Sequence, residues 1–228
     1  MVIFVNTSHK HIDWHNFFNG SAGPDEKGRR ERRGSETRER LFRCAMNLFR
    51  EHGFHDTTVE DITNAADVGK GTFFNYFPSK EHILTALGEV QVAKYEKAVA
   101  LAAEEETRDA LHWLYQALPA EAGSSPKMVR SLFTVFLTSE PVREFLTGKL
   151  VSARLQLRDM FREAQKRGEI PNHCQPEDLA FRFQQSLFGT MFLWTLQKPA
   201  PALEEWLDEG FDFFWSGVCA PPVKRSKP

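Results

Sequence analysis

One polar stretch in the first third of the 228-residue chain carries side chains that suit a phosphate-binding or base-reading surface. Lys70, Gly71 and Thr72 stand together, and the pair Thr57 and Thr58 precedes them. A lysine can reach a guanine edge or a phosphate, and a glycine permits close approach to a groove. Threonine hydroxyls and free backbone N–H groups at the start of a helix favour a phosphate. These residue types in this order indicate contact with a nucleic acid.

The segment 57–80 predicts two short helices joined by a tight turn. Thr57 and Glu60 have the spacing of a capping box, so the first of these helices should begin at Thr57. Asp67 lies at the turn, and aspartate tolerates left-handed backbone geometry better than most residues. Pro78 should end the second helix, because proline disfavours helical geometry in the residue before it. Two short helices joined in this way form a helix-turn-helix.

The second of these helices should present one face to DNA. If Phe73 and Phe77 face the core, Asn75 and Tyr76 face the duplex one turn beyond the start of the helix. Lys80, at the start of the following helix, is predicted to bind a further phosphate. Any small helical bundle can show an apolar pattern with a short turn, but packing alone does not require an exposed Lys-Gly-Thr sequence. The pattern therefore favours DNA binding over a purely structural role.

The elements around this segment are helical in period. Apolar residues recur at helical spacing from about residue 35 onward without strand-like alternation, so the sequence predicts an all-α fold of about nine helices. We expect a disordered leader at 1–28, a basic arm at 29–34, a DNA-binding domain at 35–95 with its helix-turn-helix at about 58–77, a ligand-binding and dimerisation domain at 96–219, and a disordered tail at 220–228.

The charge of the chain limits where a nucleic-acid surface can lie. The net charge is -2, so such a surface must be a local patch. The segment from Lys27 to Lys80 carries eleven basic and eight acidic residues, which makes it positive within a chain that is negative as a whole. The basic arm before the helix-turn-helix can lie along phosphates or enter the minor groove, and a solvated tail explains it equally well.

Several classes of protein do not fit the sequence. Cys44, Cys174 and Cys219 lie far apart without a C-x-x-C pair, which suits a reducing cytoplasm and neither a disulfide framework nor a zinc site. No apolar stretch is long enough to span a bilayer, and the opening apolar run is too short for a signal peptide. Because no known catalytic motif occurs, we expect no catalytic residue, cofactor or metal.

The segment resembles the DNA-binding domain of the tetracycline-repressor (TetR) family. The resemblance covers about Ser35 to Val90 and beyond that extends only to the number and order of the helices. It implies a one-component repressor that binds double-stranded operator DNA as a homodimer and responds to a small molecule. The matching residues are Ala45, Leu48, Phe49, Gly53, Phe54, Thr57, Thr58, Val59, Ile62, Ala65, Ala66, Val68, Lys70, Gly71, Thr72, Tyr76, Phe77, Ser79 and Lys80.

One residue on the recognition helix departs from the family pattern. The family usually carries a tyrosine at the position of Phe74, and its hydroxyl donates a hydrogen bond to a phosphate. Phe74 cannot donate that bond, so we expect a van der Waals contact with a sugar or a thymine methyl group instead. The affinity for DNA should then be modestly lower, or depend more on Lys70 and Lys80.

Two apolar stripes near the C-terminus predict a dimer contact. The resemblance implies that the last two helices pair with their copies in a four-helix bundle. The alternative is that both stripes fill the core of the monomer. The stripes consist of Leu179, Phe183, Leu187, Met191 and Trp194 on one helix and of Leu203, Trp206, Phe213 and Phe214 on the next.

Large apolar side chains in the C-terminal domain predict an apolar effector, either aromatic or acyl, as the resemblance also implies. The candidate binding residues are Trp113, Phe133, Phe136, Phe161, Phe188 and Phe192. Polar specificity could come from His112, Gln156, Gln184 or Gln185. The aromatic residues could equally pack against one another without leaving a cavity.

Two other functions remain open from the sequence. A helical ligand-binding or scaffold protein could keep the helix-turn-helix as a fold without binding DNA, but both Lys70 and Lys80 are present. A helical-bundle enzyme with a di-iron site would need paired Glu-x-x-His motifs on facing helices, and two such motifs do not occur.

Overall fold

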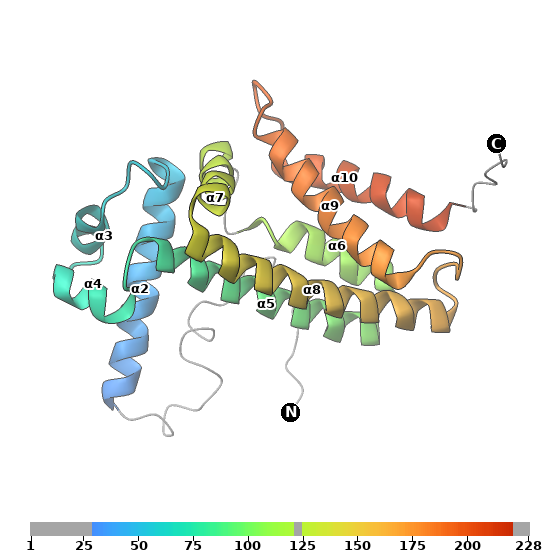
Figure 1. Cartoon of the computed structure of the whole chain (residues 1–228), viewed down its shortest axis with the longest axis horizontal. Helices are drawn as coiled ribbons and strands as arrows, with labels where there is room; N and C mark the ends of the chain where they lie inside the picture. The colour runs from blue at the N-terminus through green and yellow to red at the C-terminus, as the bar shows by residue number, and fades with distance from the viewer. Residues whose placement is uncertain (1–28, 121–124, 221–228) are drawn as a thin grey trace. The chain divides into compact units, whose positions relative to one another are not determined.

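The computed structural model describes residues 29–120 and 125–220. These residues form nine helices and no strand, which confirms the predicted all-α fold. The predicted leader and nearly all of the predicted tail lie outside the described residues. The helices are α2 (Arg29–Glu51), α3 (Val59–Ala65), α4 (Lys70–Tyr76), α5 (Glu81–Glu104), α6 (Thr107–Ala117), α7 (Pro126–Thr138), α8 (Glu140–Arg167), α9 (Pro176–Trp194) and α10 (Leu203–Cys219) (Figure 1).

The helices gather into two compact units that do not divide at a single point of the chain. Of the described residues, 29–91, 119–120 and 125–147 belong to the first unit, and 92–118 and 148–220 belong to the second. The helices α5 and α8 therefore each begin in the first unit and continue into the second. The domain boundary predicted at residue 95 differs from this division, because α7 and the start of α8 belong with the N-terminal helices.

The helix α2 forms the support of the helix-turn-helix in the first unit. It begins at Arg29, so the predicted basic arm at 29–34 is the first part of this helix. Figure 1 shows α3 and α4 beside α2, and α3 packs against both of them. Gly53 ends α2 with a φ of 93°, a left-handed geometry that favours glycine. The buried side chains of this part include Leu41, Phe42, Ala45, Phe49, Ile62, Phe73 and Phe77.

The helix α7 is tied to the C-terminal end of α2 within the same unit. The hydroxyl of Ser125 donates to the carbonyl oxygen of Arg50 at 3.1 Å. The backbone N–H group of Phe54 donates to the hydroxyl oxygen of Ser131 at 3.3 Å. The first bond satisfies a carbonyl group that the C-terminal end of a helix leaves free, and the second satisfies an N–H group of the loop. The end of α2 and the loop that follows it are therefore held from the side of α7.

The second unit is built on the crossing of α6, α9 and α10. The hydroxyl of Tyr115 lies 3.0 Å from Oγ of Ser186 and 3.1 Å from Oγ1 of Thr190, so a buried polar group finds partners on α9. A methyl group added at Gly210 would lie 2.6 Å from Oγ1 of Thr190 and 3.0 Å from the Tyr115 hydroxyl. The missing side chain of Gly210 thus permits the close approach of α10. Edge-to-face aromatic contacts join Tyr115, Phe161, Phe183, Phe211 and Phe214.

The apolar stripes predicted for the dimer contact mostly fill the core of this unit. Trp206 donates its indole N–H group to the carbonyl oxygen of Thr190 at 2.9 Å, and Phe213 is 82% exposed. The buried members are Leu179, Phe183, Leu187, Met191, Trp194, Leu203 and Phe214. The prediction was wrong for these residues because both helices carry apolar residues on two faces, and periodicity alone does not tell which face is internal.

The tight crossing at Gly210 makes a prediction about stability. Changing Gly210→Ala should lower the free energy of unfolding by about 1–2 kcal/mol, since overpacking outweighs the higher helix propensity of alanine. The matched control is Gly148→Ala on α8, where an added methyl group meets no atom within 4 Å. Chemical denaturation should show the control to be as stable as the parent protein or slightly more stable. Equal stability of the two variants would contradict the close approach of α10.

Candidate DNA-binding surface

The helix α3 starts one residue later than the sequence predicts. Its capping box is formed by Thr58 and Asp61: the hydroxyl oxygen of Thr58 accepts from the Asp61 N–H group at 3.1 Å, and Thr58 N–H donates to Oδ2 of Asp61 at 2.8 Å. Hydrogen bonds from the side chain and backbone of Thr58 hold the pKa of Asp61 below its ordinary value. The expected pairing of Thr57 with Glu60 is therefore wrong, although the type of cap is right.

Thr57 is turned towards the protein. Its hydroxyl donates to the carbonyl oxygen of Gly53 at 2.8 Å, and the residue is buried. Thr58 is exposed, but its hydroxyl donates to Oδ2 of Asp61 at 2.7 Å. Neither hydroxyl is thus free to anchor a phosphate as the sequence suggested. Both threonines instead fix the place where α3 begins.

The recognition helix α4 faces as predicted. Asp67 has a φ of 50° in the turn before it, which is the left-handed geometry expected for this aspartate. Phe73 and Phe77 are buried and close the core, whereas Phe74 is 52% exposed and Asn75 is exposed. The helix therefore has one face in the core and one face open to a ligand.

The open face begins at Lys70. Its Nζ lies 2.9 Å from Oε2 of Glu60 on α3, and both side chains are exposed. Gly71 is exposed, and a methyl group added there would meet no atom within 4 Å. Thr72 is half-buried on the same first turn. Four residues, Lys70, Gly71, Phe74 and Asn75, thus lie exposed along one short helix beside the start of α3.

Tyr76 has a more restricted place than the sequence suggests. The residue is half-buried, and its hydroxyl lies next to Gly34 of α2, where an added methyl group would be 3.5 Å from it. Tyr76 therefore lies at the edge of the open face, with its hydroxyl beside α2.

Lys80 does not extend to solvent as a phosphate ligand would. Its Nζ donates to the carbonyl oxygens of Phe54 at 2.6 Å and Thr57 at 2.7 Å, and it lies 4.3 Å from the centre of the Phe54 ring. Burial holds the pKa of Lys80 below its ordinary value. The predicted phosphate contact is replaced by a link between the start of α5 and the loop before α3. Sequence spacing gave no signal for this contact because its acceptors are backbone atoms.

The structure does not bring the predicted effector residues together. Phe133 and Phe136 belong to α7 in the first unit, and the other candidates belong to the second. Phe161 is buried against Phe214, whereas Phe188 and Phe192 are exposed on α9. Nζ of Lys97 lies over the ring of Trp113, 4.6 Å from the centre of that ring.

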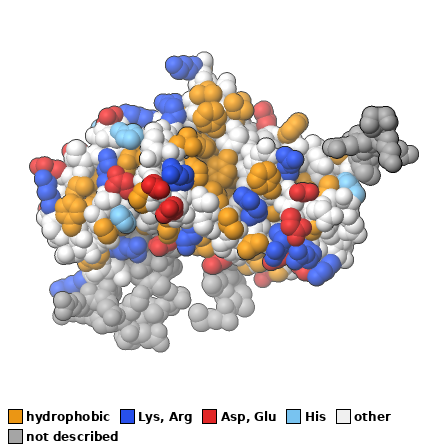
Figure 2. Space-filling model, viewed as in Figure 1, with side chains coloured by type: hydrophobic (Ala, Val, Ile, Leu, Met, Phe, Trp, Pro, Cys, Tyr) orange, Lys and Arg blue, Asp and Glu red, His pale blue; other side chains and the backbone are white. Residues whose placement is uncertain are grey.

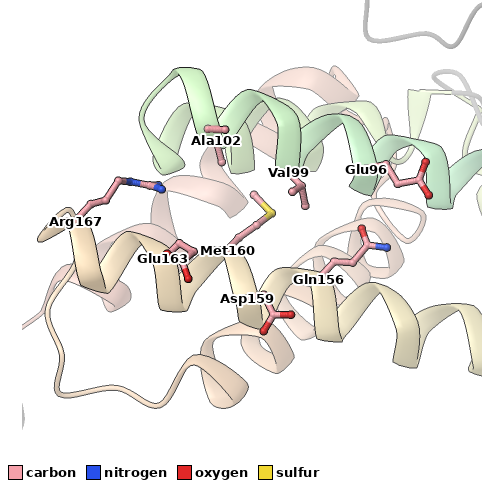
Figure 3. Close-up of a pocket in the computed structure, with 9 residues that line it drawn as sticks. Glu96, Val99, Ala102, Gln156, Asp159, Met160, Glu163 and Arg167 are labelled. Atoms are coloured by element: carbon pink, nitrogen blue, oxygen red, sulfur yellow. The ribbon is translucent and has the colours of Figure 1, made fainter. Parts of the chain in front are cut away.

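A cleft of about 490 Å³ lies instead between α5 and α8 of the second unit. Of the polar candidates from the sequence, Gln156 lines this cleft, and Figure 3 shows it opposite Glu96. The sequence missed the cleft because it is lined by small or flexible side chains and not by the large aromatic residues. The lining residues are Glu96, Val99, Ala102, Ala103, Gln156, Asp159, Met160, Glu163 and Arg167.

Within residues 29–120 and 125–220, no helix is both long and apolar enough to cross a membrane. In the same ranges, no group of three or more His, Cys, Asp or Glu residues is placed to hold a metal ion.

Comparison with known proteins finds relatives of one kind. Residues 41–87 match the family described as bacterial regulatory proteins, tetR family. The transcriptional regulator TcmR of Streptomyces glaucescens is 39% identical over 77 residues, which are 32% of this chain and 34% of that protein. The regulator UidR of Escherichia coli K12 is 25% identical over 140 residues, which are 59% of this chain and 69% of that protein. The match to TcmR thus spans about a third of that relative.

Solved structures extend the similarity to the whole fold. FadR of Thermus thermophilus, described as a TetR family transcriptional repressor in complex with lauroyl-CoA, is 25% identical with a TM-score of 0.58. That comparison covers 84% of this chain and 100% of the other. The fatty acid degradation regulator FadR of Bacillus halodurans is 18% identical with a TM-score of 0.68, covering 85% of this chain and 98% of the other.

The contrast between Lys80 and Lys70 can be tested by stability. Changing Lys80→Ala should lower the free energy of unfolding by about 1–3 kcal/mol, because the carbonyl groups of Phe54 and Thr57 lose their donor. Changing Lys70→Ala removes only an exposed ion pair and should cost less than about 1 kcal/mol. Thermal and chemical denaturation measure both. If Lys80→Ala melts like the parent protein, the link between Lys80 and the loop does not stabilise the fold.

Proposed function

Because the chain belongs to the TetR family of bacterial transcriptional regulators, we propose that it is a cytoplasmic repressor that binds a palindromic operator as a homodimer and is released by a small molecule. The observation that carries the proposal is the division of α4 into a buried face at Phe73 and Phe77 and an open face at Lys70, Gly71 and Asn75. A helix with this division can enter a major groove while its other face stays packed on α2 and α3.

The open face has the chemistry for reading DNA. Lys70 can bind a guanine edge or a phosphate, and Gly71 lets the backbone of α4 approach the groove. Asn75 can pair with an adenine through two hydrogen bonds. Phe74 offers an apolar ring to a thymine methyl group or a sugar. Thr57 and Lys80 act behind this face by holding the loop before α3.

The ion pair between Glu60 and Lys70 affects the strength and the specificity of DNA binding by the open face. In the free protein Oε2 of Glu60 lies 2.9 Å from Nζ of Lys70, so the carboxylate partly neutralises the charge of the lysine. DNA must compete with Glu60 for that charge, and Glu60 itself repels phosphates. The pair therefore weakens binding to DNA in general and leaves binding more dependent on contacts that Lys70 makes with particular bases.

Gel shifts with a duplex from the gene's own upstream region test the proposal. Lys70→Ala should weaken operator binding about tenfold and reduce the salt dependence by about one phosphate contact if Lys70 reaches the backbone. Glu60→Gln should strengthen binding to unrelated duplexes severalfold, because it removes a negative charge and releases Lys70.

The control for these variants is their melting temperature, which should stay close to that of the parent protein. A parent protein that binds no upstream duplex even at low salt would support the alternative of a helical scaffold. An unchanged affinity of Lys70→Ala would instead remove Lys70 from the interface.

The dimer contact in the proposal rests on the outer faces of α9 and α10. Figure 2 shows hydrophobic side chains exposed over α9. Phe213 of α10 is the most exposed of the large apolar residues described. On α9 the exposed apolar residues are Phe181, Phe188, Phe192 and Leu193. An apolar surface of this extent is costly in a monomer and suits an isologous contact with a second copy.

Light scattering tests the dimer contact. Phe213→Asp combined with Phe192→Asp should shift the protein from dimer to monomer, a species of 26.2 kDa, because each change buries a carboxylate in an apolar interface. Both residues are exposed in the chain, so the helical content should be retained. Leu137→Asp, at an exposed apolar residue of α7, is the control and should remain dimeric. A dimeric double variant would place the contact elsewhere.

The cleft between α5 and α8 supports the small-molecule part of the proposal. Its volume of about 490 Å³ suits a drug-sized ligand. The helix α5 carries Glu96 and Val99 at the cleft, and its first residue, Glu81, follows α4 by a few residues. A ligand that favours one position of α5 therefore biases the position of α4, and operator DNA must bias ligand binding in return.

A further inference from the structure

The cleft between α5 and α8 has an apolar floor and a charged rim. Val99 and Ala102 of α5 face Met160 of α8 across its middle (Figure 3). Figure 3 also shows Arg167 at one end of the cleft and the pair Glu96 and Gln156 at the other. A bound molecule would therefore lie with an apolar body along the floor and with its polar part at one end.

The arginine end of the cleft is already occupied by protein contacts. Arg167 forms an ion pair with Glu169 and donates from Nη2 to Oγ1 of Thr107 at 2.7 Å. Thr107 in turn donates its backbone N–H group to Glu169 at 2.9 Å. Among the described residues that line the cleft, Arg167 is the one basic side chain. A carboxylate or phosphate ligand would have to break this network to reach a positive charge.

Two of the acidic residues on the rim are also paired. Oδ1 of Asp159 lies 2.9 Å from the guanidinium groups of both Arg158 and Arg162. Oε1 of Glu163 lies 2.7 Å from Nζ of Lys166. Their charges are therefore satisfied on the protein surface beside the cleft. They add no free group that would bind a ligand.

The other end of the cleft carries one buried acceptor without a donor and one exposed carboxylate. The side-chain oxygen of Gln156 is buried and has no hydrogen-bond partner among the described residues. Glu96, on the opposite helix, is exposed, and its carboxylate forms no ion pair or hydrogen bond with the described part of the chain. A buried amide oxygen without a donor costs free energy, so a ligand that supplies a donor at this point gains affinity.

We propose that the effector of this protein is an apolar molecule with a protonated amine, bound with its chain over Val99, Ala102 and Met160 and with its ammonium group between Glu96 and Gln156. The proposal rests on the proposed function, since it names the ligand class of the same small-molecule site. The proposed ligand class differs from the ligand of the structural neighbour in complex with lauroyl-CoA, because coenzyme A carries phosphates. An ammonium group offers three N–H donors and a positive charge, which matches one carboxylate and one amide oxygen.

Isothermal titration with three probes of equal chain length tests the proposal. Decylamine is protonated at neutral pH, as a lysine side chain is, whereas decanol is neutral and decanoate is anionic. All three are used below their micelle concentrations on the full-length protein. Decylamine should bind at least about tenfold more tightly than decanol, and decanoate more weakly than decanol.

Variants of the chain identify the site. Glu96→Gln should weaken decylamine about tenfold and leave decanol within about twofold. Gln156→Leu keeps the size of the side chain without the acceptor and should weaken decylamine more than decanol. Glu205→Gln, at an exposed glutamate of α10 away from the cleft, is the matched control and should change neither. Val99→Trp fills the floor and should abolish binding of both decylamine and decanol.

Two results would overturn the proposal: decanoate binding as tightly as decylamine, or decylamine binding equally to the parent protein and to Glu96→Gln. Gel shifts on the same samples keep the two proposals apart. Operator binding without selectivity for decylamine overturns the ligand class alone. Selective decylamine binding by a protein that binds no DNA upholds the cleft and overturns the repressor. A folded Val99→Trp variant that still binds decylamine would place the site elsewhere.

Discussion

The ammonium group of Lys80 donates to the carbonyl oxygens of Phe54 and Thr57, and this contact fixes the loop between α2 and α3. Thr57 closes the same loop from its other side through its bond to Gly53. With the loop fixed, Thr58 becomes the cap of α3, and α4 follows after a turn of defined geometry at Asp67. The exposed residues of the recognition helix thus owe their position to groups that are themselves turned away from solvent.

Lys70 and Lys80 have different roles for a physical reason. A side chain that reads DNA must give up its partners on binding, so weak and exposed contacts such as that of Lys70 with Glu60 suit the task. A side chain that positions the reading helix must keep its partners, which suits the two carbonyl bonds of Lys80. Both are lysines within one short motif, and only their surroundings distinguish them.

The sequence predicted the helices of the motif and the facing of α4 because local signals decide them. Pro78 ends α4, and the apolar spacing of Phe73 and Phe77 places both in the core. The cap at Thr58 was missed by one residue, since Thr57 and Thr58 have the same chemistry and only the bond of the Thr57 hydroxyl to the Gly53 carbonyl separates them. The role of Lys80 could not be read from spacing because its partners are backbone atoms 23 and 26 residues away.

The second unit was harder to predict for a related reason. Aromatic residues on α9 occupy two faces, and the choice between core and surface depends on how α6 and α10 cross it at Tyr115 and Gly210. The cleft likewise depends on which small side chains α5 and α8 turn towards each other. Such long-range choices leave no periodic trace, whereas the positions of the Glu96 carboxylate and of the buried Gln156 oxygen become informative once the helices are placed.

Hydrogen exchange of the backbone amides, with and without a duplex from the gene's upstream region, distinguishes the helix that contacts DNA from the residues that position it. Exchange should be slower in the DNA complex along residues 70–76 and at the start of α3, with little change in α10. The amides of Gly53 and Phe54 should exchange slowly in both states, because they donate to Phe49 and Ser131 in a loop that Lys80 and Thr57 hold before DNA arrives. Unchanged exchange in α4 on binding would contradict the role of this helix, and protection of Gly53 and Phe54 only in the complex would contradict the role of Lys80.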